Sequence, residues 1–465
     1  MQKKYIPLIL LILLPTIANF TSSYFLATSN KPHFKPEDSQ LFLQDGHKKS
    51  RKINGCSVPE WNTIRLEDVP HAANLQKWAN LGPVESKNSL RGEARLISAF
   101  VYKDQISIII TKQHIEKYDV TCLYYDCKRR EIANSSFPTQ TAPMSVVTCP
   151  RRVGVEFVSV SFTDNHVPHE PIPLIYRAYN EPIYELAVCV GPLFGTESKW
   201  LQIAESVEHY RLLGAKYFYF TLFNINEYDF KILSYYAKFG YAEYTHYITQ
   251  HKKLNWKAHS IQTQECHYRS RFHSKWVINV DIDERLVWTH SDSLLHFLRT
   301  LPPTIAKINI ATSSVEKTGK SPAKMHNFSE LHSELMFLKY NKTGEIKWSN
   351  FKGMYRPEKI FTLSGNWSNL EENYVHVMVM PKRIGHFRKY KNTGAHRPEG
   401  YSFKHSSEET RLDPTFENQL ATNVLEKVGY VYNQRGIRCE ELPEIFFSVF
   451  TRKVLDCKFK NETMS

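Results

Sequence analysis

The chain has 465 residues and a formal net charge of +13, from 60 Lys and Arg against 47 Asp and Glu. Hydrophobic residues make up 42% and charged residues 23%, the composition of a globular protein that is long enough to bury a large core. This composition excludes a polytopic membrane protein and a mostly disordered chain, while the positive charge favours an anionic partner such as nucleic acid, an anionic membrane surface or a phosphorylated substrate.

The N-terminus carries a membrane-targeting pattern. Lys3 and Lys4 precede an apolar run over residues 6–20, and uncharged residues up to Ala27 extend it to the ~20 residues that a spanning helix needs. Two alternatives fit, an uncleaved signal anchor and a cleaved signal peptide. We predict the anchor, with the remaining chain placed in the lumen by the positive-inside rule. The predicted segments are a cytoplasmic tail over 1–4 and a transmembrane helix over 5–27.

Sequons and cysteines agree with a lumenal compartment, where nucleic acid is not a partner. Five N-x-S/T sequons lie outside the apolar run, at Asn134, Asn327, Asn341, Asn366 and Asn461. The even set of eight cysteines can form disulfides there: Cys56, Cys122, Cys127, Cys149, Cys189, Cys266, Cys439 and Cys457. The sequence does not fix their pairing. Proximity along the chain favours Cys122 with Cys127 or Cys149, and Cys439 with Cys457.

The next segments predict a stem and a small β-rich module. Residues 28–92 are polar, with a basic cluster over 48–52, and this composition indicates a stem or an extended N-terminal segment. Over 93–182 the pattern changes to short β-like runs bounded by turn residues such as those at Asn134–Pro138 and Pro143. The predicted strands of this module cover 96–102, 106–111, 120–125 and 153–162.

From residue 183 the pattern alternates between strands and helices. Strand-like apolar runs at 186–190, 217–223, 241–248 and 276–280 alternate with helical periodicity over 200–213, 226–239 and 256–272. Gly214 and Gly240 end the first two helices, and Asn226 can cap the second. The alternation predicts an α/β domain over 183–400, with a mostly parallel, Rossmann-like sheet flanked by helices, and a C-terminal extension over 401–465.

Asp281 and Asp283 leave the last of these strands directly. Ligands of such sheets bind beyond the carboxyl ends of the strands, where two carboxylates can hold Mg²⁺ or Mn²⁺ and, through the ion, a diphosphate. A bare D-x-D is more often a solvated turn, but here five apolar residues precede it. A phosphatase would use the first Asp as nucleophile, but its pair normally opens the domain, whereas this one follows three β-α units.

Several strings of this region resemble glycosyltransferase family 92. They are CVGPLFG (189–195), Trp200 with EHYRLLGA (208–215), YFYF (217–220), Cys266 with Arg269, and KWVINVDIDERL (275–286). The resemblance covers about 183–390. It implies a GT-A fold, a UDP-sugar donor, UDP-galactose in the known members, a Mn²⁺ or Mg²⁺ ion, and inversion at the anomeric carbon. It also implies a single-pass type II protein of the Golgi membrane, with a glycan as acceptor.

The resemblance assigns roles to individual residues. Asp281 and Asp283 match the motif that binds the metal and the diphosphate, with Asp283 as the direct metal ligand. Residues 385–388 (GHFR) resemble the closing His-Tyr-Arg motif, with Phe in place of Tyr. His386 is then the third metal ligand, or else a partly buried histidine bonded to the backbone. His376 competes with it, but its alternating apolar surroundings are more typical of a core strand.

Further contacts with the donor are predicted around these motifs. Arg388, within a basic run that also holds Lys382, Arg383, Lys389 and Lys391, would face phosphate from a loop, unless the run is a solvated face. The nucleotide is expected to approach the backbone at Val190, Gly191 and Pro192, which otherwise form an ordinary turn. Arg269 either faces the nucleotide or pairs with a carboxylate.

An inverting transfer needs a general base, normally Asp or Glu, near the acceptor hydroxyl. The sequence does not identify it, and Glu334 and Glu358 are the candidates among several acidic residues after the D-x-D. Two hypotheses from different classes follow. The first is an active glycosyltransferase, and the second is a secreted or membrane-anchored carbohydrate-binding protein without catalytic activity. The intact DIDE string and His386 favour the enzyme.

Overall fold

The computed structural model describes most of the chain between residues 50 and 433. The described ranges are 50–53, 55–59, 95–111, 119–142, 146–162, 170–247, 256–364, 367–370, 375–392, 403–405 and 410–433. The predicted tail and anchor, and almost all of the predicted stem, lie outside these ranges. Within them, no helix is both long and apolar enough to cross a membrane.

The described chain forms two compact units, neither of which is one continuous stretch. The first unit takes the described residues before 184, together with Thr263–Lys275 and those of 361–369. The second unit takes Tyr184–Gln262, Trp276–Ile360 and the described residues from 370 onward. The chain therefore passes from one unit to the other several times. The predicted domain boundaries at 183 and 400 do not describe this arrangement, because they divide the chain into continuous segments.

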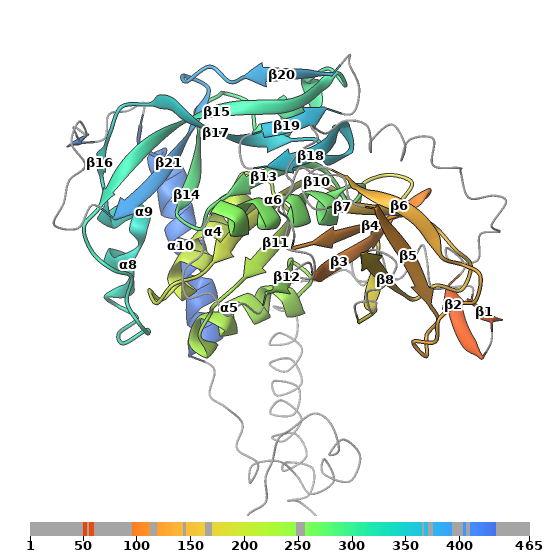
Figure 1. Ribbon diagram of the computed structural model, residues 1–465. Helices are drawn as coiled ribbons and strands as arrows, with labels where there is room; N and C mark the ends of the chain where they lie inside the picture. Colours follow the sequence, from red (N-terminus) through yellow and green to blue (C-terminus); the bar gives the residue numbers. More distant parts are fainter. Residues whose placement is uncertain are drawn as a thin grey trace, which may run out of the picture. The chain divides into compact units, whose positions relative to one another are not determined.

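A closed barrel forms most of the first unit (Figure 1). Its strands are β3 Leu96–Val101, β4 Gln105–Ile110, β5 Asp119–Tyr125, β6 Phe137–Ala142, β7 Val146–Pro150, β8 Phe157–Phe162 and β9 Ile172–Tyr176. They follow the order β3-β4-β7-β6-β5-β8-β9, and the parallel pairing of β3 with β9 closes the ring. Alternating β-branched residues such as Val101, Ile108 and Val158 fill the interior. Four of these strands were predicted, whereas β6, β7 and β9 were not.

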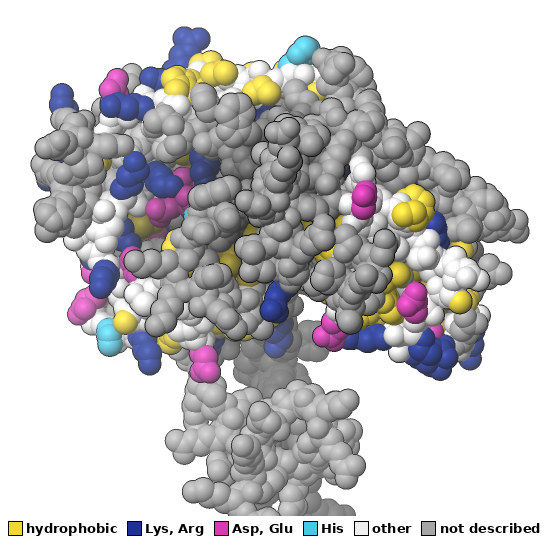
Figure 2. Space-filling model, in the orientation of Figure 1, with side chains coloured by type: hydrophobic (Ala, Val, Ile, Leu, Met, Phe, Trp, Pro, Cys, Tyr) yellow, Lys and Arg dark blue, Asp and Glu magenta, His cyan; other side chains and the backbone are white. Residues whose placement is uncertain are grey.

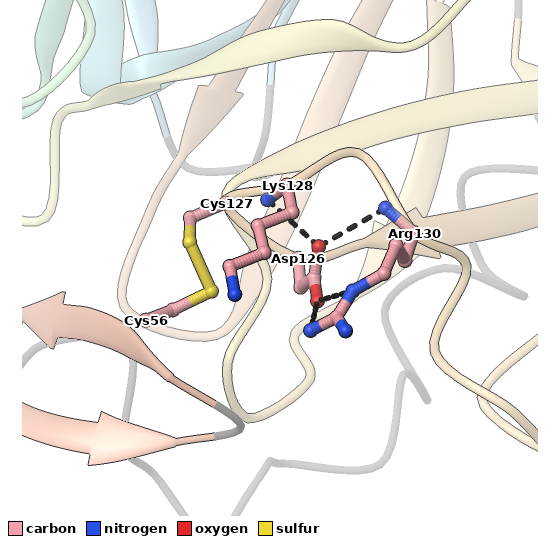
Figure 3. Close-up of a disulfide and its surroundings, with 5 residues drawn as sticks. All are labelled: Cys56, Asp126, Cys127, Lys128 and Arg130. Carbon is pink, nitrogen blue, oxygen red and sulfur yellow. Dashed lines mark hydrogen bonds and ion pairs between the residues drawn. A yellow bond between two sulfur atoms is a disulfide. The ribbon is translucent and has the colours of Figure 1, made fainter.

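Two disulfides reinforce this unit. Cys122 on β5 pairs with Cys149 on β7, which is one of the two alternatives predicted for Cys122. Cys127 pairs instead with Cys56 and so ties the hairpin of β1 (Ser50–Ile53) and β2 (Cys56–Pro59) to the turn after β5 (Figure 3). Cys189 and Cys266 are disulfide-bonded as well. Cys439 and Cys457 lie outside the described residues.

The turn after β5 is organised by Asp126, as Figure 3 shows. Its carboxylate accepts hydrogen bonds from the backbone N–H groups of Lys128 (2.8 Å) and Arg130 (3.0 Å) and pairs with the Arg130 guanidinium (2.6 Å). These bonds hold the pKa of Asp126 below its usual value against the effect of burial. The turn thereby presents Cys127 to Cys56.

The first half of the second unit has the predicted α/β pattern. Strands β10 Tyr184–Leu193, β11 Tyr217–Leu222 and β12 Ala242–His246 are parallel neighbours. The crossovers are α4 Trp200–Leu212 and α5 Glu227–Lys238 (Figure 1). Gly214 follows α4 at φ 101°, and Asn226 caps α5 by accepting the N–H of Asp229 at 2.8 Å, as predicted. Helix α6 Trp256–Ser270 and strand β13 Ser274–Val280 complete the alternation.

The second half corrects the prediction of a mostly parallel sheet. Strand β17 Lys347–Tyr355 pairs antiparallel with both β13 and β15 Ile305–Lys317, and β14 Glu284–Trp288 pairs antiparallel with β21 Gly385–Asn392. Strands β20 His376–Val379 and β21 are parallel to β15. Small strands β16 Lys342–Thr343 and β22 Lys404–His405 extend the edge. Strands β18 Ile360–Ser364 and β19 Trp367–Leu370, most of whose residues belong to the first unit, form a separate two-stranded sheet. The larger sheet is therefore mixed.

The reason for this change is the shortness of the helices after β13. Parallel strands need a crossover of a dozen or more residues, usually a helix. After β13 come only α7 Leu294–Thr300, α8 Leu331–Glu334, α9 Met336–Lys339 and the 3-10 turn Pro357–Lys359 before α10 Pro414–Tyr432, within the described ranges. Helix α10 belongs to the core, where Leu420, Val424 and Val428 are buried.

Strand β20 corrects a second expectation. Its alternating apolar sequence predicted a core strand around His376. The strand forms, but His376 is exposed, and Val377 and Val379 are among the exposed large hydrophobic residues of the described chain. Among the described strands β20 pairs with β15 alone, so it lies at an edge of the sheet. Its alternating apolar residues therefore do not form a buried face.

Candidate active site

The strand order of the second unit reverses at β10. Strands β11 and β12 lie on one side of β10 and β13 lies on the other, giving the order β12-β11-β10-β13 (Figure 1). In open α/β sheets, ligands bind beyond the carboxyl ends of the strands at such a reversal. Strand β10 ends there at Leu193, with Phe194 directly after it, and Asp281 and Asp283 follow the end of β13.

The turn that carries the aspartates is held by its own residues. The Glu284 carboxylate accepts the backbone N–H of Asp281 at 2.9 Å, and the Glu284 N–H donates to the Asp281 carbonyl at 3.1 Å. The fully buried Arg285 donates to the carbonyls of Ile282 at 2.7 Å and Glu284 at 2.9 Å. These bonds fix the backbone that carries the carboxylates of Asp281, Asp283 and Glu284.

Two lysines contact both Asp281 and Glu284. Lys389 Nζ lies 2.6 Å from Asp281 Oδ2 and 2.9 Å from Glu284 Oε1. Lys352 Nζ lies 3.2 Å from Asp281 Oδ1 and 3.2 Å from Glu284 Oε2. Burial raises the pKa of Asp281, but the two ammonium groups outweigh it and hold that pKa well below its usual value. The same contacts raise the pKa of both lysines, against burial.

Both lysines come from strands next to the end of β13. Strand β17 pairs with β13 as far as Asn279 and Gly353, which brings Lys352 beside the point where β13 ends. A Cβ at Gly353 would overlap the carbonyl oxygen of Ile308 on β15, so only glycine allows this close strand pairing. Strand β21 pairs Lys389 with Glu284 on β14.

Asp283 differs from Asp281 in having no hydrogen-bond or ion-pair partner for its side chain among the described residues. Its backbone carbonyl accepts the N–H of Tyr390 at 3.0 Å, which fixes its position. Burial raises the pKa of its carboxyl group to about 7; Lys389 opposes the shift, and Asp281 and Glu284 add to it. The carboxyl group therefore has hydrogen-bonding capacity left for a ligand, as an acceptor and, when protonated, as a donor.

Phe194 and His259 complete the described surroundings, and the sequence analysis missed both. Phe194 follows β10 with 41% of its surface exposed, and its ring meets the His259 ring edge-on, with the centroids 6.2 Å apart. Burial lowers the pKa of His259, although the nearby Asp281 opposes this shift. Phe194 stands in the CVGPLFG string, but no sequence pattern shows that its side chain is exposed.

His386 and Arg388 lie on the other face of the β14–β21 ribbon from Lys389, because side chains alternate along a strand. Arg388 is buried and donates to the Tyr340 carbonyl at 3.1 Å. His386 is fully buried, and burial with Arg388 lowers its pKa to about 4. Neither of its ring nitrogens has a partner among the described residues, so it is not bonded to the backbone there either. Arg388, Lys389 and Lys391 of the basic run lie on strand β21 and not on a loop, whereas Lys382 and Arg383 lie in the turn before it.

The described residues do not fit the divalent ion that the family resemblance implies. They contain no group of three His, Cys, Asp or Glu side chains that could hold a metal ion. Both oxygens of Asp281 are paired with ammonium groups, and His386 faces away from the aspartates. The predicted set of Asp281, Asp283 and His386 is therefore not brought together.

The other predicted nucleotide contacts are occupied within the protein. Val190, Gly191 and Pro192 are buried, and Gly191 has φ 141° with its Cα facing β11, where a Cβ would lie 3.0 Å from the Thr221 carbonyl oxygen. The glycine is thus needed for strand packing. Arg269, in the first unit, donates to Glu265 at 2.5 Å, the second of its two predicted alternatives.

Neither candidate for the general base is placed at the aspartates by a described contact. Glu334, at the end of α8, pairs with Lys339 at 2.6 Å. Glu358 is half-buried in the 3-10 turn next to Arg356, where its charge opposes the lowering of the Arg356 pKa by burial. The identity of the base stays a prediction.

In the view of Figure 2, Lys and Arg side chains lie over the region that carries β15, β16 and β20 in Figure 1. Their presence agrees with the positive net charge of the chain. A reversed strand order next to clustered carboxylates and lysines is typical of α/β proteins that bind nucleotides or other phosphorylated ligands.

The sequence profile described as Glycosyltransferase family 92 matches residues 184–428, more than half of the chain. The chain therefore belongs to glycosyltransferase family 92, which confirms the resemblance seen in its motifs.

Solved structures give weaker similarities. The structure of S. aureus TarS, residues 1–349, in complex with UDP-GlcNAc is 11% identical, covers 53% of this chain and 73% of its own, and has a TM-score of 0.26. A mycobacterial protein is 10% identical, covers 55% and 76%, and has a TM-score of 0.23. No conclusion about this chain rests on these similarities. No curated protein sequence matches the chain.

Proposed function

We propose that this family 92 glycosyltransferase transfers a hexose, with inversion, from a UDP-sugar to a glycan of glycoproteins or glycolipids, and that the donor is UDP-galactose. The observation that carries the proposal is the cluster of Asp281, Asp283 and Glu284 with two lysines at the end of β13, where the strand order reverses. The hexose and the nucleotide are suggested by the family and not by a described contact.

In such a transfer the acceptor hydroxyl attacks the anomeric carbon and loses its proton to a base, while the bond to the diphosphate breaks and UDP leaves with the electron pair. Asp283 would accept hydrogen bonds from donor hydroxyls, since its side chain has no described protein partner. Phe194 offers an exposed ring beside the site. Glu334 and Glu358 remain the candidates for the base. No step is assigned to a metal ion, because the described residues do not fit one.

We also propose that the enzyme is a single-pass type II protein of the Golgi membrane with its folded units in the lumen. Lys3 and Lys4 before an apolar run support this orientation, and the barrel disulfides suit an oxidising compartment. Protease treatment of sealed Golgi vesicles should leave the folded units intact. Their digestion without detergent would contradict the proposed orientation.

The function is tested with a panel of UDP-sugars and glycan acceptors, scored for glycosylated product. We expect one UDP-hexose to give product, and UDP to raise the melting temperature of the protein, as any ligand that binds only the folded state does. A carbohydrate-binding protein without activity would be stabilised by glycans but would neither bind UDP nor form product. That outcome would overturn the proposal.

A further inference from the structure

We propose that Lys352 and Lys389 bind the diphosphate of the donor and take the place of a divalent cation in this site. The inference rests on the proposed function, since it needs a nucleotide diphosphate as ligand. It concerns two strands that the D-x-D motif does not include, β17 and β21. The two ammonium groups together carry the double positive charge that a Mg²⁺ or Mn²⁺ ion would bring to a leaving diphosphate.

The first observation is the number of donors. A lysine ammonium group has three N–H donors. Lys389 uses two of them, on Asp281 Oδ2 and Glu284 Oε1, while Lys352 donates one to Asp281 Oδ1 and lies 3.2 Å from Glu284 Oε2 as an ion pair. Each ammonium group therefore keeps at least one N–H without a described acceptor. Two such donors, side by side, match the oxygens of a diphosphate.

The second observation is the position of these donors. Both lysine side chains are 21% exposed, so ligand and solvent can reach them although they pair with a buried glutamate. Asp281 and Glu284 each contact both lysines, which fixes the two ammonium groups beside the end of β13. A carboxylate that holds a lysine in place lowers the entropy lost when the lysine binds a phosphate oxygen.

The third observation concerns competition with a metal ion. Both oxygens of Asp281 accept an ammonium group, so a divalent ion bound to Asp281 would lie close to two positive charges that repel it. The four lysine contacts therefore disfavour a metal ion at Asp281, and the lysines supply the cation in this protein.

The inference is tested by measuring UDP binding to the purified full-length protein by calorimetry, once in EDTA and once in excess Mn²⁺. We expect the dissociation constants to agree within about threefold, a difference of less than 1 kcal/mol. We expect Lys352→Met and Lys389→Met to weaken UDP binding in EDTA by about tenfold or more each, the effect of losing a hydrogen bond between charged groups. Lys347→Met, at a half-exposed lysine of the same strand β17, is the matched control and should bind UDP like the native protein.

The outcomes separate this inference from the proposed function. UDP binding that needs Mn²⁺ would overturn the inference and leave the proposed function intact. Binding in EDTA that both lysine variants retain would also overturn it. Absence of UDP binding under both conditions would overturn the proposed function and the inference with it. The comparison of EDTA with Mn²⁺ uses the native protein, so it decides the matter even if a lysine variant fails to fold.

Discussion

The barrel of the first unit and the sheet of the second differ in what they bury. The cluster that fills the barrel is apolar, made of residues such as Val101, Ile108 and Val158, with the half-cystines of one disulfide among them. The second unit also has a large apolar core, but it buries charged side chains between α4 and the β14–β21 ribbon: Glu205, His209, Arg285, His386 and Arg388.

The two regions are stabilised by different interactions. Strand closure and disulfides stabilise the barrel without any buried charge in its central cluster. In the second unit, buried charge is needed because Arg285 holds the turn of Asp281 and Glu284, and Arg285 itself needs Glu205, 3.8 Å away. Several buried atoms there have no described hydrogen-bond partner, including Glu205 Oε2 and both ring nitrogens of His386. Buried waters usually complete such a network.

The largest effect is expected at Arg285. Arg285→Leu removes its hydrogen bonds to backbone carbonyls and leaves Glu205 buried without its cation, so the free energy of unfolding should fall by about 3–5 kcal/mol. Denaturant titration measures the loss. The control is Arg299→Leu, which breaks the surface pair with Glu185 and should change stability little. Equal effects of the two variants would contradict a special role for the buried charge.

A change in the barrel should lower stability without affecting activity. Replacing Cys122 and Cys149 together by Ala removes a disulfide between residues 27 apart and should lower the free energy of unfolding by about 2–4 kcal/mol. Transferase activity at 25 °C should remain, because neither residue belongs to the unit that contains Asp281. Thermal unfolding and a product assay on the same sample check both points. Loss of activity from a still folded double variant would show that the barrel takes part in catalysis.

Acid should affect the second unit through His209. This buried histidine bonds to the Leu286 carbonyl at 2.9 Å, and burial together with Arg285 lowers its pKa to about 3. A lowered histidine pKa stabilises the fold above the unfolded value of about 6.5, and this contribution is lost as the pH falls toward 3. The free energy of unfolding should therefore decrease by up to about 1.4 kcal/mol per pH unit in this range. His209→Gln should have a flatter pH profile, and an unchanged profile would refute the assignment.

A smaller effect is expected at the start of α5. Asn226 Oδ1 accepts the N–H of Asp229 at 2.8 Å, so Asn226→Ala should lower the free energy of unfolding by about 1 kcal/mol. Asn226→Ser keeps an acceptor at this position without adding a charge beside Asp229, and it serves as the control. If both variants lose the same amount in denaturant titration, the helix cap is not the cause.

The sequence predicts the parallel half of the second unit well, for local reasons. The signals in this half are local: Gly214 ends a helix, Asn226 caps one, and the apolar runs at 217–223 and 276–280 form strands. The structure has the helices and strands that these signals predict. The antiparallel half could not be predicted, because β17 and β21 meet β13 and β14 only through pairings between distant segments.

The same limit applies to the site. Asp281 and Asp283 were found because a buried strand leads directly into them. Lys352 gave no signal, since a lysine between apolar residues of a strand does not show what it will face. His386 and Arg388 were expected at the aspartates from their motif, but strand alternation turns them to the opposite face from Lys389. The register of strand pairing, which a single sequence does not determine, decides which of these side chains lie together.

The most direct test of the central claim, that residues 281–284 form the donor site, is the rate of UDP release with Asp283→Ala. The Asp283 side chain has no described protein partner, so its removal should leave the melting temperature unchanged while the rate with donor and acceptor falls at least about 100-fold. Asp292→Ala, at an exposed aspartate 3.9 Å from His290, is the control and should keep the native rate. A native rate in well-folded Asp283→Ala would contradict the account.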